Sequence, residues 1–303
     1  MALPRVWLDG ALVAPDEARI SVLSHAIQRG AAVFDVGVLR PGDRGPLLFR
    51  PADHVSRFLR STAAIGPGID PLLDAETLLR ATVETARASG ATSALVRWTA
   101  FIADAEPDVV PRSGARASVA IAILPDDPAA TAKPATVRVS VPRDARKAGP
   151  EVFPPHAKVA ASYLGPMLAK RRAREQGYDE VVLLDGEGHL AEAPTANVFI
   201  VRAGVLHTPP LGRILPGITR DSALAIARAE AIPVHEAPLG LEDLAAADEA
   251  FLTASSFPVQ GISAVDGRPL RAAAPVTARM RSMLLACERG EDPRFASWVV
   301  PVR

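Results

Sequence analysis

Lys158 is the residue whose type and surroundings most directly suggest chemistry. Residues 154–163 read Pro-Pro-His-Ala-Lys-Val-Ala-Ala-Ser-Tyr, and only four of the 34 basic residues of the chain are lysines. Lysine can lose its proton and act as a nucleophile, whereas arginine effectively cannot. Small and apolar neighbours partly desolvate an amine, which favours its attack on an aldehyde. The local sequence leaves open a structural lysine at a strand–helix junction with its head group in water.

Glu192 is a candidate acid within residues 188–199, which read Gly-His-Leu-Ala-Glu-Ala-Pro-Thr-Ala-Asn-Val-Phe. It follows a β-like apolar pair and precedes small residues. A buried carboxylate at this place needs a partner, and a protonated pyridine nitrogen would serve. The alternative is a glutamate on an edge strand that faces solvent.

Two further segments carry groups suited to phosphate binding. Residues 215–219 (Leu-Pro-Gly-Ile-Thr) open a predicted helix, and the first backbone N–H groups of a helix attract anions. Gly217 allows the backbone to approach a ligand closely, although an ordinary N-cap by Thr219 is the alternative. Residues 253–256 (Thr-Ala-Ser-Ser) supply further hydroxyl groups or form a simple turn.

Together these segments provide an amine, a carboxylate, phosphate donors and, in Tyr163, a phenol five residues after Lys158. Pyridoxal 5′-phosphate requires such groups: a lysine for its aldehyde, an acid for its ring nitrogen and donors for its phosphate. The sequence contains no GxGxxG, GxxxxGK[ST] or GxSxG motif. The six histidines form no HxH or HExxH pattern and there is one cysteine, so no metal site is predicted.

The strands and helices expected around these residues indicate an α+β fold of two domains. We expect a small N-terminal domain over 1–124, a linker rich in Pro and Asp over 125–135, and a larger C-terminal domain over 136–303. Asp9-Gly10 predicts a hairpin between strands at 5–8 and 11–13. Further strands are expected at 21–23, 33–39, 47–50, 93–102, 117–124, 136–141, 180–184, 189–191, 197–201, 205–207 and 249–254. Helices are expected from residue 51 and at 72–88, 163–177, 218–231 and 275–287.

The composition is that of a globular protein of 303 residues, with 49% hydrophobic and 22% charged residues. Basic and acidic residues balance at 34 each, so no bulk charge favours nucleic acid or an anionic membrane. No apolar run reaches the roughly 18–20 residues that a membrane helix needs. With one cysteine and no signal-peptide pattern, a cytoplasmic location is expected.

The chain resembles the class IV aminotransferases, pyridoxal phosphate enzymes of fold type IV, and among them most the branched-chain amino-acid aminotransferases. The resemblance extends from the hairpin at residues 7–10 to the strand at 249–254. Its most specific pieces are HAK158VAASY163, HLAE192APTAN197VF and LPG217IT219RD. It implies that Lys158 forms the Schiff base and moves the proton, that Tyr163 binds the phenolic oxygen and that Glu192 pairs with the ring nitrogen.

The same resemblance implies the remaining cofactor contacts and the assembly. Leu215 would pack on the ring, Gly217 would allow close approach, and phosphate would be bound by Arg57, Ile218, Thr219, Ser255 and Ser256. Family members are at least homodimers, because the neighbouring subunit contributes to each site. Residues 24–30 would make that contribution here.

The substrate side departs from the branched-chain pattern. Leu95-Val96-Arg97 stands where Tyr-Ile-Arg is usual, Arg29 precedes Gly30 where Tyr is usual, and Phe34-Asp35-Val36 stands where Phe-Glu-Gly is usual. The arginine that usually follows is replaced by Val38. The substrate-binding residues implied are Arg29, Phe34, Val36, Leu95 and Arg97. Two arginines would favour a dicarboxylate such as 2-oxoglutarate.

The resemblance therefore predicts a transaminase that exchanges an amino group between an amino acid (branched-chain, hydrophobic or glutamate) and a 2-oxo acid by a ping-pong cycle. A D-amino-acid or (R)-amine transaminase of the same fold is the main alternative, because fold does not determine function. A lyase resembling aminodeoxychorismate lyase, which eliminates pyruvate, is another. A non-catalytic binding protein would be expected to lack Lys158 or Glu192, and both are present.

Overall fold

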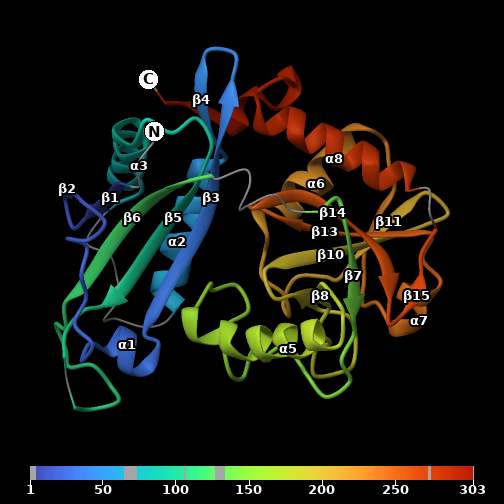
Figure 1. Ribbon diagram of the computed structural model, residues 1–303, viewed down its shortest axis with the longest axis horizontal. Coiled ribbons are helices and arrows are strands. Elements are labelled where there is room, and N and C mark those ends of the chain that lie inside the picture. The colour runs from blue at the N-terminus through green and yellow to red at the C-terminus, as the bar shows by residue number, and fades with distance from the viewer. Residues whose placement is uncertain (1–4, 65–73, 106, 127–133, 272–273, 303) are drawn as a thin grey trace. The chain divides into compact units, whose positions relative to one another are not determined.

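The computed structural model describes residues 5–64, 74–105, 107–126, 134–271 and 274–302. They form two compact units, one drawn from Met1–Ala132, Ala157–Ala161 and Ala286–Arg303 and the other from Lys133–His156 and Ser162–Leu285. Each unit combines a large sheet with helices (Figure 1), which confirms the α+β class. Two short segments of the C-terminal half, 157–161 and 286–303, thus belong to the first unit. The predicted linker falls mostly on 127–133, outside the described residues, and the predicted domain limits stay a prediction.

The first unit is built on a seven-stranded antiparallel sheet. In spatial order its strands are β16 (Val299–Pro301), β4 (Gly45–Phe49), β3 (Ala32–Gly42), β5 (Ala94–Ile102), β6 (Ala117–Pro125), β1 (Arg5–Leu8) and β2 (Ala11–Val13). The predicted hairpin between β1 and β2 is confirmed, with φ of 46° at Asp9 and 104° at Gly10. Positive φ at both central residues suits the right-handed twist of the strands.

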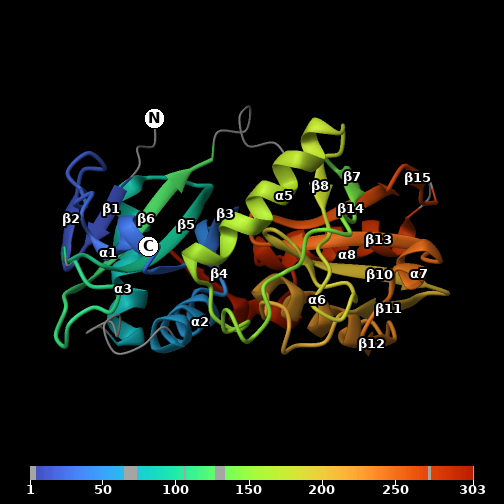
Figure 2. The ribbon, with the colours of Figure 1, turned by 90° about the horizontal axis from the view of Figure 1, so that it is seen from below.

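The helices α1 (His25–Arg29), α2 (Pro51–Ala64) and α3 (Ala75–Ser89) belong to this unit. The helices α2 and α3 lie along one face of the sheet (Figure 2) and bury Val55, Phe58 and Leu78 there. The strand predicted at 21–23 is wrong, because this segment forms a turn without a partner strand. Ser24 then caps α1 by accepting a hydrogen bond from Ile27 N.

The second unit contains a mixed sheet in the order β12-β11-β10-β13-β14-β7-β8, with β15 paired to β14 and β9 to β10. The strands are β7 (Thr136–Ser140), β8 (Glu180–Val181), β9 (Glu192–Ala193), β10 (Ala196–Arg202), β11 (Val205–Thr208), β12 (Val234–Glu236), β13 (Glu249–Ala254), β14 (Phe257–Val265) and β15 (Arg268–Pro269). Phe199 and Phe251 face each other across the buried central strands β10 and β13, and their rings stack with centroids 5.0 Å apart.

The remaining helices are η1 (Ala160–Tyr163), α5 (Leu164–Glu175), α6 (Ile218–Ala229), α7 (Leu241–Ala245), α8 (Pro275–Glu288) and η2 (Pro293–Trp298). The strand predicted at 189–191 is wrong: Leu190 forms only an isolated bridge to Leu184, and β9 starts at Glu192. Within the described ranges, no helix is both long and apolar enough to cross a membrane.

Candidate active site

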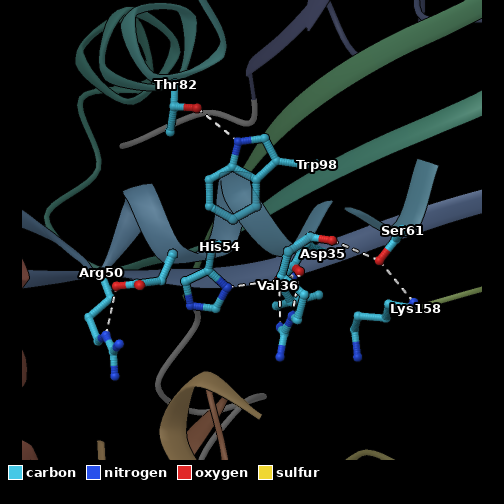
Figure 3. A network of polar contacts seen from close by, with 10 residues as sticks. Asp35, Val36, Arg50, His54, Ser61, Thr82, Trp98 and Lys158 are labelled. Carbon is cyan, nitrogen blue, oxygen red and sulfur yellow. Dashed lines mark hydrogen bonds and ion pairs between the residues drawn. The ribbon is translucent and has the colours of Figure 1, made fainter. Parts of the chain in front are cut away.

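The backbone of Lys158 is fastened to β3 and α2 in the first unit. Phe34 N donates a hydrogen bond to the Lys158 carbonyl at 3.0 Å, and Val33 and Val159 form an antiparallel bridge. Lys158 N donates to the Ser61 hydroxyl, also at 3.0 Å (Figure 3). The short segment that carries Lys158 therefore has a defined position against the sheet, although it lies far from β3 in the sequence.

The side chain of Lys158 is buried, with 9% of the residue exposed. Its Nζ atom lies 4.9 Å from the centroid of the Phe34 ring, a distance typical of a cation–π contact. This placement contradicts the alternative of a lysine with its head group in water. It is the partly desolvated environment that favours a nucleophilic amine.

Four of the predicted substrate residues share one face of the β3–β5 pair. Val36 lies opposite Arg97 and Val38 opposite Leu95, while Phe34 is two residues before Val36 and points to the same side. The Arg97 guanidinium carbon lies 5.4 Å from the Phe34 ring centroid. The first unit thus brings the Lys158 amine together with a partly exposed apolar surface that carries one exposed arginine.

The opposite face of β3 carries a buried charge cluster (Figure 3). Asp35, fully buried, accepts hydrogen bonds of 2.7 Å from both Nε and Nη2 of Arg57 and contacts His54 Nδ1 at 2.8 Å. Burial alone raises the pKa of Asp35, but the charge and hydrogen bonds of Arg57 and the contact with His54 outweigh it and hold this pKa well below its usual range. Asp35 therefore stays ionised and fixes the side chain of Arg57.

His54 is itself held from the other side. Its ring stacks on Trp98 at 5.7 Å, and Trp98 Nε1 donates to the Thr82 hydroxyl of α3 at 2.9 Å. A Cβ at Gly37 would lie 2.9 Å from the Trp98 ring, so this position requires glycine. Sequence reasoning assigned no role to Asp35 or His54. One signal was available: His54 and Arg57 are three residues apart on α2 and so share its buried face.

Glu192 occupies the second unit, where β9 and β10 pair it directly with Asn197. Its Oε2 atom accepts hydrogen bonds from Asn197 Nδ2 at 2.9 Å and from Leu215 N at 3.1 Å. Its Oε1 atom forms an ion pair with Lys147 Nζ. With 9% of the residue exposed, Glu192 is not the solvent-facing glutamate of the alternative interpretation. Sequence reasoning missed Lys147 and Asn197 as its partners, although lysine is rare in this chain.

The predicted phosphate segment begins helix α6. Gly217 is the N-cap and no side chain caps the helix, so the alternative of a cap by Thr219 is wrong: Thr219 is the second helical residue, and it is buried. A Cβ at Gly217 would lie 2.0 Å from Asn197 Oδ1, so only glycine allows this backbone to approach the Asn197 and Glu192 cluster. Ser255 and Ser256 form the turn between β13 and β14.

The other predicted site residues lie in both units. In the second unit Tyr163 precedes α5 and is half-buried, as is Leu215, while Ile218 starts α6. In the first unit Arg29 ends α1, and its Nη2 donates to the Pro107 carbonyl at 2.9 Å.

One group of potential metal ligands occurs among the described residues: Asp185, Glu187 and His189, at a turn before β9. Arg213 forms ion pairs with both acids of this group.

The donor set of the second unit fits pyridoxal phosphate. A carboxylate has about four lone-pair positions, and the hydrogen bonds of Glu192 involve the three donors Lys147, Asn197 and Leu215 N, which leaves room for a ring N–H. Asn197 in turn lies opposite Thr253 on β13, and the buried Thr253 Oγ1 lacks a hydrogen-bond partner among the described residues. An unsatisfied buried hydroxyl at this place is consistent with a bound polar group.

Comparisons with known proteins agree with this chemistry. The model of the family "Amino-transferase class IV" matches residues 32–265. The branched-chain-amino-acid aminotransferase of Salmonella typhimurium is 31% identical over 301 residues, covering 98% of this chain and 97% of the relative.

Two solved structures have the same fold. A branched-chain aminotransferase from Thermoproteus uzoniensis with norvaline has a TM-score of 0.93 at 36% identity and covers 100% of both chains. A branched-chain amino acid aminotransferase from T.th. complexed with N-(5′-phosphopyridoxyl)-L-glutamate has a TM-score of 0.92 at 32% identity, covering 100% of this chain and 99% of that one. These matches confirm the predicted fold type, and this chain belongs to the class IV aminotransferases.

Proposed function

We propose that the protein is a pyridoxal 5′-phosphate-dependent aminotransferase that moves an amino group from an amino acid to a 2-oxo acid in a ping-pong cycle. The observation that carries this function is the buried amine of Lys158 above Phe34, on the face that Val36, Leu95 and Arg97 share. Support comes from relatives named as branched-chain aminotransferases and from neighbours solved with norvaline and with a phosphopyridoxyl-glutamate.

Bound pyridoxal phosphate supplies an aldehyde and an electron-withdrawing ring. Lys158 Nζ would hold the cofactor at its aldehyde carbon, and the same amine would move the proton of the substrate Cα. Glu192 would pair with the protonated ring nitrogen, and Tyr163 would donate to the phenolic oxygen. Leu215 packs against the ring. The phosphate would be held by Arg57, Ser255, Ser256, the N-cap Gly217 and the first two residues of α6, Ile218 and Thr219.

The substrate-facing residues fit two kinds of side chain. Phe34, Val36 and Leu95 offer an apolar surface to a branched-chain or other hydrophobic amino acid. Arg97, exposed on the same face, can pair with the distal carboxylate of glutamate or 2-oxoglutarate. Arg29 is proposed as a second such contact. A D-amino-acid or (R)-amine transaminase is the alternative, favoured by the absence of the tyrosines usual at positions 29 and 95.

A homodimer is proposed from an exposed apolar patch on the first unit. Val22, Leu23 and Ile27 are each more than half exposed, as are Val109 and Val110. The two segments approach each other where His25 N donates to the Asp104 carbonyl and Arg29 Nη2 donates to the Pro107 carbonyl. Such a patch is typical of a subunit interface. Light scattering should give twice the chain mass, and Ile27→Asp should lower it toward one chain mass; a monomeric wild type would contradict the proposal.

We also propose a cytoplasmic location. The chain has a single cysteine, Cys287, and so forms no internal disulfide, as is usual for proteins of a reducing compartment. Cell fractionation with antibody detection tests this, and recovery in another compartment would contradict it.

The function is tested by the visible spectrum of the purified protein, titrated singly with L-leucine, L-glutamate, D-alanine and (R)-1-phenylethylamine. Bleaching of the cofactor band by an L-amino acid is expected. Bleaching only by D-alanine or by the amine would favour the alternative transaminase. Pyruvate release without any oxo-acid acceptor would indicate elimination instead. A protein that gains no visible band after pyridoxal phosphate is added would contradict the function.

A further inference from the structure

Lys147 is a charged residue beside the expected cofactor acid that the proposed function does not use. Its ammonium group forms an ion pair with Glu192 Oε1, and the two side chains are 20% and 11% exposed. Its backbone N donates to the Leu184 carbonyl at 2.8 Å, and the preceding Arg146 bridges the same residue. The backbone of Lys147 is thus fixed to the second unit, and its side chain contacts the Glu192 carboxylate instead of extending into solvent.

The three donors around Glu192 divide between its two oxygens. Asn197 Nδ2 and Leu215 N reach Oε2 at 2.9 and 3.1 Å, whereas Lys147 reaches Oε1. Donors on both oxygens fix the plane of the carboxylate. Of these three donors Lys147 alone carries a formal charge. Removing the charged partner of a buried carboxylate leaves its charge uncompensated, which is unfavourable.

We propose that Lys147 is a positioning residue that balances the charge of Glu192 and holds its carboxylate oriented toward the ring nitrogen of pyridoxal phosphate. This inference rests on the proposed function. Lys147 acts through Glu192 and does not itself touch the cofactor. Without it, Glu192 loses the one charged donor among its three and its partner on Oε1, so its carboxylate is no longer held toward a protonated ring nitrogen. Substitution of Lys147 should therefore lower the binding affinity of ligands that have a nitrogen at that ring position.

The chain offers a matched control in Lys170. Its ammonium group forms an ion pair with Glu180 Oε2 in the same unit, at side-chain exposures of 25% and 6%. Lys170→Met therefore removes the same charge from a comparably buried glutamate. Because Glu180 has no proposed role toward the cofactor, this variant reports the structural effect of losing such an ion pair.

The test measures ligand binding to the full-length protein freed of cofactor. Wild type, Lys147→Met, Lys147→Arg and Lys170→Met are titrated with pyridoxal phosphate and with 1-deazapyridoxal phosphate, in which C–H replaces the ring nitrogen. Lys147→Met should weaken pyridoxal phosphate binding about tenfold, which corresponds to about 1.4 kcal/mol, and change binding of the deaza compound less than about twofold. Lys147→Arg should restore binding, and Lys170→Met should leave both affinities near those of wild type.

Two outcomes would overturn the role of Lys147: wild-type affinity of Lys147→Met for pyridoxal phosphate, or equal losses for both ligands. If Lys147→Met does not fold, Lys147→Gln, which keeps a donor and removes the charge, takes its place with the same expected losses. Failure of wild type to bind either ligand would instead overturn the proposed function, so the two failures are distinguishable.

Discussion

Asp35 and Arg57 join β3 to α2 through two hydrogen bonds of 2.7 Å, made where the carboxylate is wholly removed from solvent. A single side chain on the strand therefore sets the direction of an arginine on the helix. Since Lys158 is tied to Phe34 and Ser61, the neighbours of this pair along β3 and α2, the cluster and the amine share one rigid support.

Asp35→Asn should destabilise the protein strongly, because it leaves the Arg57 guanidinium buried without its anion. Breaking one side of a buried ion pair costs about 3 kcal/mol or more, whereas Asp179→Asn, which alters an exposed pair with Arg138, should cost far less. Urea unfolding of the two variants measures the difference. Equal urea midpoints of unfolding for the two variants would show that the buried ion pair stabilises the protein no more than the exposed one.

The pH dependence of stability should carry a signature of His54. Burial lowers the pKa of His54 from 6.5, and this outweighs the opposing effect of Asp35. Below pH about 6.5 the unfolded chain binds a proton at this residue that the folded protein does not bind, so stability falls as the pH falls. Urea unfolding at pH 7.5, 6.5 and 5.5 should show this decline, and His54→Gln should reduce it. If the free energy of unfolding declined as steeply with falling pH in His54→Gln as in wild type, His54 would not be a neutral, buried residue of the folded protein.

Lys158→Ala should abolish turnover, with a loss of about a thousandfold or more, because it removes the amine proposed to form the covalent link and move the proton. The visible band of the bound cofactor should also disappear. Stopped-flow assays and absorption spectra report the two effects separately. Full activity in this variant would remove Lys158 from the mechanism.

Arg97→Ala should affect acidic substrates selectively. Arg97 is the exposed cation on the face shared with Phe34 and Val36, so its loss removes a carboxylate partner and leaves the apolar surface intact. We expect KM for 2-oxoglutarate to rise about tenfold while KM for L-leucine changes little. Steady-state kinetics with each substrate varied in turn measures both KM values. Equal changes in the two KM values would argue against the proposed role.

Gly217→Ala should damage the start of α6, since its Cβ would lie 2.0 Å from Asn197 Oδ1. Relief requires a shift of the backbone or of Asn197, and such overpacking costs about 1–3 kcal/mol. Pyridoxal phosphate binding should weaken as well, because Asn197 also holds Glu192. Gly186→Ala is the control, as its Cβ meets no atom within 4 Å. Thermal unfolding and cofactor titration should leave the control unchanged; equal losses in both variants would refute the steric argument.

Local patterns determined much of the secondary structure. The turn residues Asp9 and Gly10 predicted the first hairpin, and apolar periodicity predicted α2, α3 and α6, because hairpin turns and amphipathic helices depend on neighbours close in the sequence. Strands depend on partners elsewhere in the chain. Residues 21–23 have strand-like composition but no partner, whereas β14, which was not predicted, pairs with β13, β7 and β15.

In the candidate site, too, some residues were identified from the sequence and others only from the folded structure. Residue type and order alone singled out Lys158, Glu192 and the segment around Gly217, because their chemistry is intrinsic to the side chains and to the backbone at a helix start. Only the folded chain paired Lys147 with Glu192 across 45 residues, and Asp35 with His54 across 19. Packing of sheets and helices creates such contacts, and burial gives them their strength, so local patterns do not specify which residues pair.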